Sequence, residues 1–408
     1  MSAVAVIGAN YGDEGKGLMT DYFASQFKGD CLVVRFNGGA QAGHTVQTIL
    51  GRRHVFSHFG AGTFTGAATY LSREYVVNPM LFAKELIELR ELGVDQADLS
   101  KKMFIDEECL VTTPYDICLN RAIENVRGAN RHGSVGVGFG ETIERSKYEE
   151  FRIRVRDLAD LDSLRKKLED LREIYVPFRL QQLGLDIGFD NAWILKSQNV
   201  SKLFKTQSRA MLDISVVCDS SIVYKFENQV FEGAQGLLLD QDYGMMPHVT
   251  RSNTGIKNIV ELANEIDLTG IDVVYTTRSY LTRHGAGPME NEIDHFPYPS
   301  IIDETNKPGN FQGKLRFAYL DPLVLGRSII DDMYKYSNKA IGEYMLAITC
   351  CDQIFGGITY HSDNKLVSTD IDEFAQKVIF WSRASGAYYT SYGPTRASVF
   401  KNCIRPAV

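Results

Sequence analysis

The sequence predicts an α/β fold: a single large domain over residues 1–408, with a mostly parallel central sheet, a P-loop-like architecture, and helical and loop excursions. Short apolar runs rich in β-branched residues alternate along the chain with segments of helical spacing, a pattern typical of parallel strands joined by crossover helices. Glycine-rich turns follow several of these runs, and in open parallel sheets ligands bind at the carboxyl ends of the strands. No internal repeat, low-complexity tract or linker divides the chain.

The composition excludes disordered and fibrous proteins, because hydrophobic residues make up 44% of the chain and charged residues 23%. Asp and Glu (51) outnumber Lys and Arg (44), and the net charge of -7 disfavours a general nucleic-acid binder. No run has the length of a membrane span, the N-terminus has no secretory signal, and the seven cysteines form no CxxC pair. We therefore expect a cytoplasmic protein with reduced thiols that binds neither membranes nor nucleic acid.

The first part of the chain carries the clearest elements. Residues 3–7 form a β-branched run that predicts a strand, and residues 18–27 have helical spacing after a glycine-rich turn. Residues 31–36 (CLVVRF) predict a second strand, which ends in GGAQAGHT, and residues 70–77 predict a third. Residues 80–92 are rich in Leu and Glu in an amphipathic pattern, which predicts a helix.

Later elements follow the same alternation. Residues 157–175 are charged and carry Leu at helical spacing, which predicts another helix. Residues 222–231 precede a further glycine-rich turn, FEGAQG. Further strands are predicted at residues 273–275, 345–349 and 357–360.

The first glycine-rich loop, GANYGDEGKG at residues 8–17, resembles a phosphate-binding loop with two departures. The P-loop pattern is GxxxxGK[ST]. Gly15 and Lys16 fit it, but Asn10 replaces the first glycine and Gly17 replaces the Ser or Thr that would hold Mg²⁺. Backbone N–H groups and the following helix N-terminus can still cradle a phosphate, with Lys16 as a point charge.

The missing hydroxyl leaves the metal in need of another ligand, and Asp13 is the candidate inside the loop. A carboxylate among phosphate-binding amides is electrostatically costly unless a cation or a proton transfer uses it. The alternative is that Asp13 and Glu14 are solvated turn residues.

Two other loops carry residues suited to catalysis or base recognition. His44 lies in the glycine-rich loop after the second strand, where an imidazole can act as an acid or as a donor to a developing oxyanion. The alternative is a structural histidine. Asp352 follows an apolar strand, as does the Asp that reads guanine in GTP-binding proteins, although Cys350 stands where that pattern has Lys.

Taken together, these segments resemble the adenylosuccinate synthetase family of GTP-dependent purine ligases. The first loop is similar to the family's GxxWGDEGKG, and VVRFNGGAQAGHTV is similar to VVRxxGGxNAGHT. FEGAQGLLLDQDYGMMPHVTRSNT is close to FEGAQGxLLDxDxGTYPYVTSSNT. The shorter segments HGSVGVGFG, LTRHGAGP, GKLRFAYLD, TCCD and SYGPTR are similar to TTGRGIGP, STRVGAGP, GRxRRxGWLD, TKLD and STGPDR.

The resemblance implies a GTP-binding architecture and a ligase that joins L-aspartate to C6 of IMP. Asp13 would take the N1 proton of the purine and, with the Gly43 carbonyl, ligate Mg²⁺. The purine oxyanion would attack the γ-phosphorus of GTP while His44 stabilises the developing charge. The aspartate amine would then displace phosphate from the 6-phosphoryl intermediate and give adenylosuccinate.

The resemblance also implies three groups of binding residues. GTP and its phosphates would contact Gly12, Glu14, Gly15, Lys16, Gly17, Gly43, Thr45, Asp352, Gly393 and Pro394. The purine monophosphate would contact Asn10, Gln41, Ser134, Val135, Gln235, Thr250 and His284. The substrate aspartate would contact Thr282, Arg283, Lys314 and Arg316.

The resemblance further implies a homodimer with shared active sites. An arginine crosses between subunits in the family. Arg145 and Arg152 are the candidates for that role in this sequence.

Departures from the family's pattern gather around the monophosphate, at Ala40, Val135 and His284. His284 stands where the family has Val near the ribose, so it is a site for altered sugar preference. One explanation of these departures is neutral drift in a divergent member. The other is a changed substrate, as in the viral branch of the family, which acts on dGMP and gives 2-amino-2′-deoxyadenylosuccinate. That branch often lacks the first-loop Asp, so the presence of Asp13 favours IMP.

Two alternatives come from other classes of protein. A non-catalytic nucleotide-binding regulator has no reason to keep Asp13, Lys16 and His44 together. A P-loop GTPase switch is disfavoured by Gly17 and by the TCCD segment.

Overall fold

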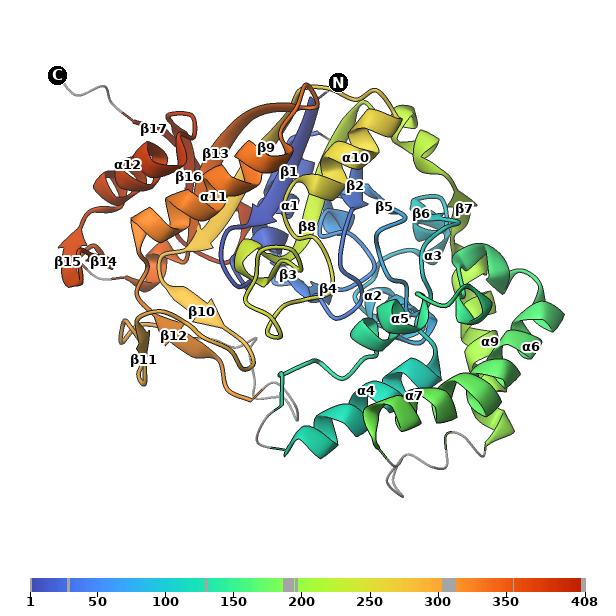
Figure 1. Cartoon of the computed structure of the whole chain (residues 1–408). Helices are drawn as coiled ribbons and strands as arrows, with labels where there is room; N and C mark the ends of the chain where they lie inside the picture. The colour runs from blue at the N-terminus through green and yellow to red at the C-terminus, as the bar shows by residue number, and fades with distance from the viewer. Residues whose placement is uncertain are drawn as a thin grey trace.

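The computed structural model describes residues 2–404 except 28–29, 129–130, 186–193, 195–196, 303–312 and 355. A ten-stranded sheet runs through it in the order β17-β16-β13-β9-β1-β8-β2-β5-β6-β7, and every neighbouring pair is parallel except β16 and β17 (Figure 1). The strands are β1 (Ser2–Gly8), β2 (Cys31–Arg35), β5 (Ala68–Leu71), β6 (Met103–Asp106), β7 (Val216–Cys218), β8 (Asn228–Gly236), β9 (Ile271–Arg278), β13 (Ile341–Thr349), β16 (Ala387–Ser391) and β17 (Val399–Cys403).

Both faces of the central strands are buried, as parallel sheets require. On β1, Val4 and Val6 pack into the same cluster as α1 (Lys16–Gln26). Ala5 and Ile7 point to the opposite face. That face is covered by α10 (Lys257–Glu265), α11 (Pro322–Tyr336) and α12 (Ile371–Ser382). The predicted α/β class with a mostly parallel sheet is confirmed.

The helical excursions form a second core beside β5 and β6, at the lower right of Figure 1. Its helices are α2 (Pro79–Glu91), α4 (Pro114–Arg127), α6 (Leu161–Asp170), α7 (Val176–Leu183) and α9 (Gln198–Ile214). The short helices α3 (Gln96–Leu99) and α5 (Phe139–Arg145) adjoin them in the chain. None of the described helices is long and apolar enough to cross a membrane.

Small antiparallel sheets complete the loop excursions. They pair β3 (His44–Gln47) with β4 (Arg53–Phe56), β12 (Arg316–Ala318) with both β10 (Leu281–Arg283) and β11 (Glu292–Ile293), and β14 (Ile358–Ser362) with β15 (Lys365–Thr369). The strand predicted at residues 357–360 is therefore real but lies outside the central sheet, in a hairpin.

Other element boundaries also differ from the sequence prediction, for identifiable reasons. The predicted strand 70–77 ends at Leu71 because a turn follows it. The predicted helix 157–175 begins at Leu161, since the Asp160 side chain caps it by accepting from two backbone N–H groups. FEGAQG is the end of β8 instead of a turn, and Gln235 (φ 63°) bulges where the pairing with β1 shifts register.

Candidate functional site

A cavity of about 1410 Å³ opens where the loops after the parallel strands meet. Most residues that the sequence singled out line it. They are Gly12, Asp13, Glu14, Gly15, Lys16, Gly17, Gln41, Gly43, His44, Thr45, Ser134, Val135, Gln235, Thr250, Arg283, His284, Asp352, Gly393 and Pro394. One cavity thus gathers segments from positions 12 to 394 of the chain.

Four of the predicted residues do not line this cavity. Asn10 is buried behind the first loop, where its backbone N–H donates to Glu14 Oε1 over 2.5 Å. Thr282 is buried in β10, and Lys314 is exposed. Arg316 is bound to Glu292, with Nε 2.7 Å from Oε1, and to the backbone carbonyls of Gly285 and Gly287, so its guanidinium is already satisfied by its own sheet and by the loop after β10.

The first loop reaches α1 through left-handed backbone conformations at Gly12 (φ 91°), Asp13 (φ 58°) and Gly15 (φ 86°). Gly17, at the start of the helix, has no room for a side chain. A Cβ there would lie 2.7 Å from the Thr45 carbonyl oxygen and 3.1 Å from the His44 carbonyl carbon. The Ser or Thr of an ordinary P-loop would therefore clash with the backbone of the loop that carries His44.

Glu14 and Lys16 form a buried pair, with Oε2 and Nζ 3.7 Å apart. Burial raises the pKa of Glu14 to about 7, against the lowering effects of the Lys16 charge and the Asn10 hydrogen bond. The interpretation of Glu14 as a solvated turn residue is wrong, since only 2% of the residue is exposed.

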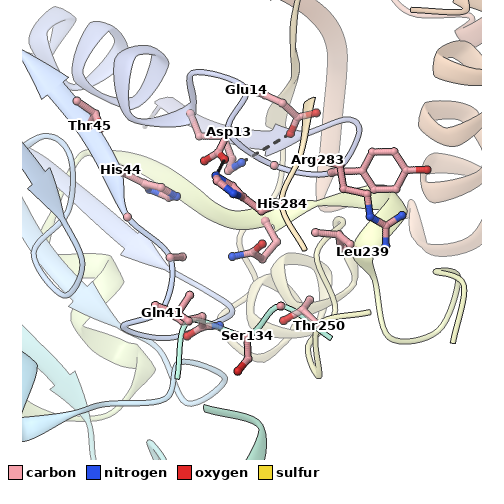
Figure 2. Close-up of a pocket in the computed structure, with 18 of the residues that line it drawn as sticks. Asp13, Glu14, Gln41, His44, Thr45, Ser134, Leu239, Thr250, Arg283 and His284 are labelled. Atoms are coloured by element: carbon pink, nitrogen blue, oxygen red, sulfur yellow. Dashed lines mark ion pairs between the residues drawn. The ribbon is translucent and has the colours of Figure 1, made fainter. Parts of the chain in front are cut away.

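Asp13 faces the cavity and pairs with His284, whose Nε2 lies 3.0 Å from Asp13 Oδ2 (Figure 2). Burial raises the pKa of Asp13, but the His284 hydrogen bond and the charges of His284, Arg278 and Lys16 outweigh it and lower the pKa to about 2. The carboxylate is therefore ionised at neutral pH.

His44 is held by a carboxylate that the sequence analysis did not assign. Its Nδ1 lies 2.5 Å from Glu232 Oε1, and the other oxygen of Glu232 accepts from the Ala61 backbone N–H over 3.0 Å. Arg35 Nε lies 3.8 Å from the same oxygen. Burial lowers the pKa of His44 against the raising effect of Glu232, so the resting imidazole is neutral.

This pairing fixes the His44 tautomer. A carboxylate accepts the proton of Nδ1, which leaves Nε2 as the second polar atom of the ring. His44 Nε2 is buried and has no hydrogen-bond partner among the described residues. Burial raises the pKa of Glu232, but its interactions with His44 and Arg35 and the hydrogen bond from the Ala61 backbone N–H outweigh this effect, so the pKa is lowered and Glu232 stays ionised. The signal that could have identified Glu232 is a carboxylate inside the buried strand that contains FEGAQG.

Arg278 and Tyr11 also line the cavity and had no role assigned from the sequence. Arg278, the last residue of β9, donates from Nε to the Asp13 carbonyl and ties the first loop to the sheet. The Tyr11 ring lies under the Arg283 guanidinium, with the Arg283 Cζ 4.4 Å from the ring centroid. Gln41 has both side-chain polar atoms buried without a hydrogen-bond partner among the described residues. Such an amide, on the cavity wall, is suited to bind a ligand.

One end of the cavity joins the loops after β13 and β16. Thr349 Oγ1 donates to the Glu14 carbonyl over 3.1 Å, which links β13 to the first loop. Asp352 follows in a short 3₁₀ turn, and Gly393 and Pro394 line the same cavity after β16. These segments therefore meet beside the first loop.

The oxygen donors of the first two loops fit a magnesium ion. Among the described residues, no cluster of three or more His, Cys, Asp or Glu side chains could hold a metal by itself. Mg²⁺ does not need such a cluster, because it commonly binds through one or two carboxylates together with substrate phosphates and water. Asp13 and the Gly43 backbone line one cavity and match that donor set.

Arg145 does not reach towards a second subunit. Its side chain is fully buried, with Nε 2.8 Å from Asp116 Oδ1, and it also donates to the Val111 and Phe151 carbonyls. Asp116 caps the start of α4, so Arg145 stabilises that helix start within the chain.

Comparison with known proteins supplies independent evidence. The family model of adenylosuccinate synthetase matches residues 5–367. The adenylosuccinate synthetase of Clostridium perfringens is 30% identical over 90% of this chain and 83% of its own length. The enzyme of a Cyanothece strain is 32% identical over 86% of this chain and 75% of its own length.

Solved structures share the fold. The fully ligated adenylosuccinate synthetase of Plasmodium falciparum superimposes with a TM-score of 0.73 at 19% identity, covering 98% of this chain and 99% of that one. The succinoaminodeoxyadenylate synthetase PurZ of cyanophage S-2L, bound to dGMP and to dATP as an energy donor, gives a TM-score of 0.57 at 13% identity, covering 98% and 95%. On the match of the family model and of these relatives, the chain belongs to the adenylosuccinate synthetase family of GTP-dependent ligases.

Proposed function

We propose that this chain joins L-aspartate to C6 of IMP with hydrolysis of GTP, through a 6-phosphoryl intermediate, and releases adenylosuccinate. The observation that carries the proposal is the presence of an ionised Asp13 and an oriented His44 in the walls of one cavity, beside a phosphate-binding type of loop. The chemistry needs a base for a purine N–H, a donor for a phosphoryl group, and cations and amides for phosphates.

Asp13 acts first. Its ionised carboxylate accepts the N1 proton of the purine, and the 6-oxygen gains the negative charge that makes it a nucleophile. That oxygen attacks the γ-phosphorus of GTP, and GDP leaves. The 6-oxygen, now esterified to phosphate, becomes a good leaving group for displacement by the aspartate amine.

His44 acts on the phosphoryl group. Its Nε2 has no protein partner in the described chain, and the negative charge of a triphosphate would raise the pKa of the imidazole. The protonated ring then donates from Nε2 to the phosphoryl oxygens while Nδ1 stays bound to Glu232. Lys16 and the first-loop amides add the charge and donors for the remaining oxygens.

We propose Mg²⁺ as the metal, held by Asp13 and the Gly43 carbonyl. When bound, the ion neutralises charge on the phosphates of the nucleotide. Asp352, with Gly393 and Pro394, would recognise the guanine. Arg283 would contact the substrate aspartate, although Lys314 and Arg316 lie outside the cavity lining.

Further parts of the proposal follow from the family resemblance. We propose a homodimer in the cytoplasm, and a cytoplasmic site agrees with the seven free cysteines. Arg152 remains a candidate for the arginine that crosses from one subunit to the other. Its Nε donates to the Ser146 carbonyl over 2.6 Å, and about a quarter of the side chain is exposed.

The discriminating experiment is phosphate release from GTP with L-aspartate and either IMP, dGMP or GMP, with the product identified by mass. We expect turnover and adenylosuccinate with IMP. Turnover on dGMP alone would instead support the synthesis of 2-amino-2′-deoxyadenylosuccinate. Nucleotide binding with no GTP consumption for any acceptor would contradict the ligase and support a regulator.

A further inference from the structure

The contact between Asp13 and His284 joins two loops that are far apart in sequence. His284 follows β10, whereas Asp13 lies in the loop after β1. The Nε2 to Oδ2 distance of 3.0 Å is a hydrogen-bonded ion-pair geometry, and both side chains are more than half buried. Figure 2 shows the imidazole directed at the carboxylate inside the cavity.

The backbone on both sides of His284 is fixed by side chains. The preceding Arg283 donates to the Pro288 carbonyl over 2.5 Å and to the His248 carbonyl over 3.1 Å. Arg316 Nη1 donates to the Gly285 carbonyl over 2.9 Å and to the Gly287 carbonyl over 2.8 Å. The arginine predicted to bind substrate therefore secures the loop that carries His284.

A close backbone contact joins the same loop to Gly133, which also lines the cavity. A Cβ on Gly133 would lie 2.4 Å from the Gly285 Cα, and Gly133 and Gly285 both have a positive φ. Only glycines can pack in this way. His284 thus projects from a loop held on several sides.

The Asp13 backbone is also held, because its carbonyl accepts from Arg278 and its φ is 58°. What remains to be set is the rotation of the carboxylate about its two side-chain bonds. A hydrogen bond from the His284 imidazole N–H to Asp13 Oδ2 fixes that rotation. The other oxygen, Oδ1, is then the one that His284 does not bind. Hydrogen-bonded support of this kind is what keeps catalytic carboxylates in a productive geometry.

We propose that His284 is a positioning residue for Asp13. The His284 Nε2–H holds the Asp13 carboxylate in the orientation in which it contacts the purine. This inference rests on the proposed function. It differs from a role in contacting the sugar, because His284 then acts through Asp13 and affects the chemical step more than substrate binding.

The test compares His284→Ala with His284→Gln, whose amide N–H can restore the donated hydrogen bond. We expect His284→Ala to lower kcat roughly 10- to 100-fold, since it removes a hydrogen bond to a charged group and frees the carboxylate to rotate. KM for IMP should change little, and His284→Gln should recover most of kcat. His295→Ala is the matched control. It breaks another His–Asp pair of 3.0 Å, with Asp294, on the exposed surface, and should leave kcat unchanged.

Each other outcome overturns the inference. An unchanged kcat in His284→Ala would show that Asp13 does not need the imidazole, and a higher kcat would show that the pair blocks the site. A large change in KM, or in the preference between IMP and dGMP, with kcat kept would make His284 a substrate contact. A lowered kcat that His284→Gln fails to restore would exclude the donated hydrogen bond as the cause. If the wild type is active, these outcomes overturn only the inference about His284. If the wild type shows no ligase turnover, the proposed function is overturned as well.

Discussion

Asp13 places a carboxylate at a backbone conformation that few residues adopt. Its φ of 58° lies in the left-handed region, where Asn and Asp are tolerated better than other non-glycine residues. Asp13→Asn therefore keeps the loop and removes the base. We expect kcat to fall by ~10²–10⁴, the usual contribution of general base catalysis, with GTP binding retained. Phosphate release at saturating substrates measures this, and an undiminished kcat would contradict the role of Asp13.

Glu232 acts on the reaction through His44. Glu232→Gln keeps the size of the side chain but replaces an ionised acceptor with an amide that can also donate, so the Nδ1 proton and the ring orientation are no longer fixed. We expect kcat to fall roughly 10- to 100-fold, as is typical when a partner that orients a functional imidazole is lost. A matched fall in GTP affinity, measured by calorimetry, would instead indicate a damaged binding site.

The pKa of His44 predicts a proton linked to nucleotide binding. Burial keeps this pKa below its ordinary value and the ring neutral, and a bound triphosphate would raise it. Binding of a non-hydrolysable GTP analogue near neutral pH should therefore take up a fraction of a proton. Calorimetry in buffers of different ionisation enthalpy measures the uptake. His44→Gln should lower it, and equal uptake in both proteins would contradict the prediction.

At the residue scale, the sequence identified cavity-lining residues where a motif places a polar residue in a strand-end loop. Asp13 and His44 were found because glycine-rich loops after buried strands mark ligand sites. Glu232 was missed because it lies inside a strand, where only the fold reveals that its side chain faces His44. Arg316 was assigned to substrate from its motif, but its engagement with Glu292 depends on the pairing of β11 with β12.

At the scale of elements, α2 is anchored to the segment after β4 by one buried carboxylate. Glu85 accepts from the backbone N–H groups of Ser57 and His58, over 2.8 and 2.7 Å, and lies near the His54 and His58 rings. Burial raises the pKa of Glu85, but the hydrogen bonds from the His54 and His58 side chains, the His58 charge and the His58 backbone N–H outweigh it and lower the pKa to about 2. The ionised carboxylate therefore stabilises the fold.

This anchor predicts a pH-dependent difference in stability. The pKa of Glu85 in the folded protein, about 2, lies below its ordinary value of 4.5. The ionised carboxylate therefore stabilises the fold fully above pH 4.5, and this stabilisation is lost as the pH falls towards 2. Its size is roughly 3 kcal/mol in the free energy of unfolding. Glu85→Gln should be less stable than wild type at neutral pH, and the gap should narrow below pH 4.5 in urea unfolding.

Glu88→Gln is the matched control on the same helix. It removes an exposed ion pair with Lys84, of 3.4 Å, and such pairs contribute little. If the difference in the free energy of unfolding between wild type and Glu85→Gln stays constant with pH, the proposed role of the ionised Glu85 is contradicted.

Sequence periodicity located elements better than it located their ends or partners. The runs that became β1, β2 and α1 were found because buried strands and helix faces leave a local pattern. A strand was predicted at residues 357–360, but its pairing with β15 in a hairpin was not, because pairing between strands is a long-range property that a single apolar run does not encode.

At the scale of the whole molecule, the sheet explains how residues so far apart reach one cavity. The strands β1, β2, β8, β9, β13 and β16 run parallel, so the loops after them open at one edge. The strand order could not be predicted from the sequence, since crossovers place β8 between β1 and β2. The family resemblance supplied what periodicity could not.

The central claim is that the purine 6-oxygen is phosphorylated before aspartate replaces it. IMP labelled with ¹⁸O at the 6-position tests this directly, with L-aspartate and unlabelled GTP and with mass analysis of the inorganic phosphate. The account predicts one ¹⁸O in each phosphate released by turnover, because the 6-oxygen departs with the γ-phosphoryl group. Unlabelled phosphate formed together with adenylosuccinate would contradict it.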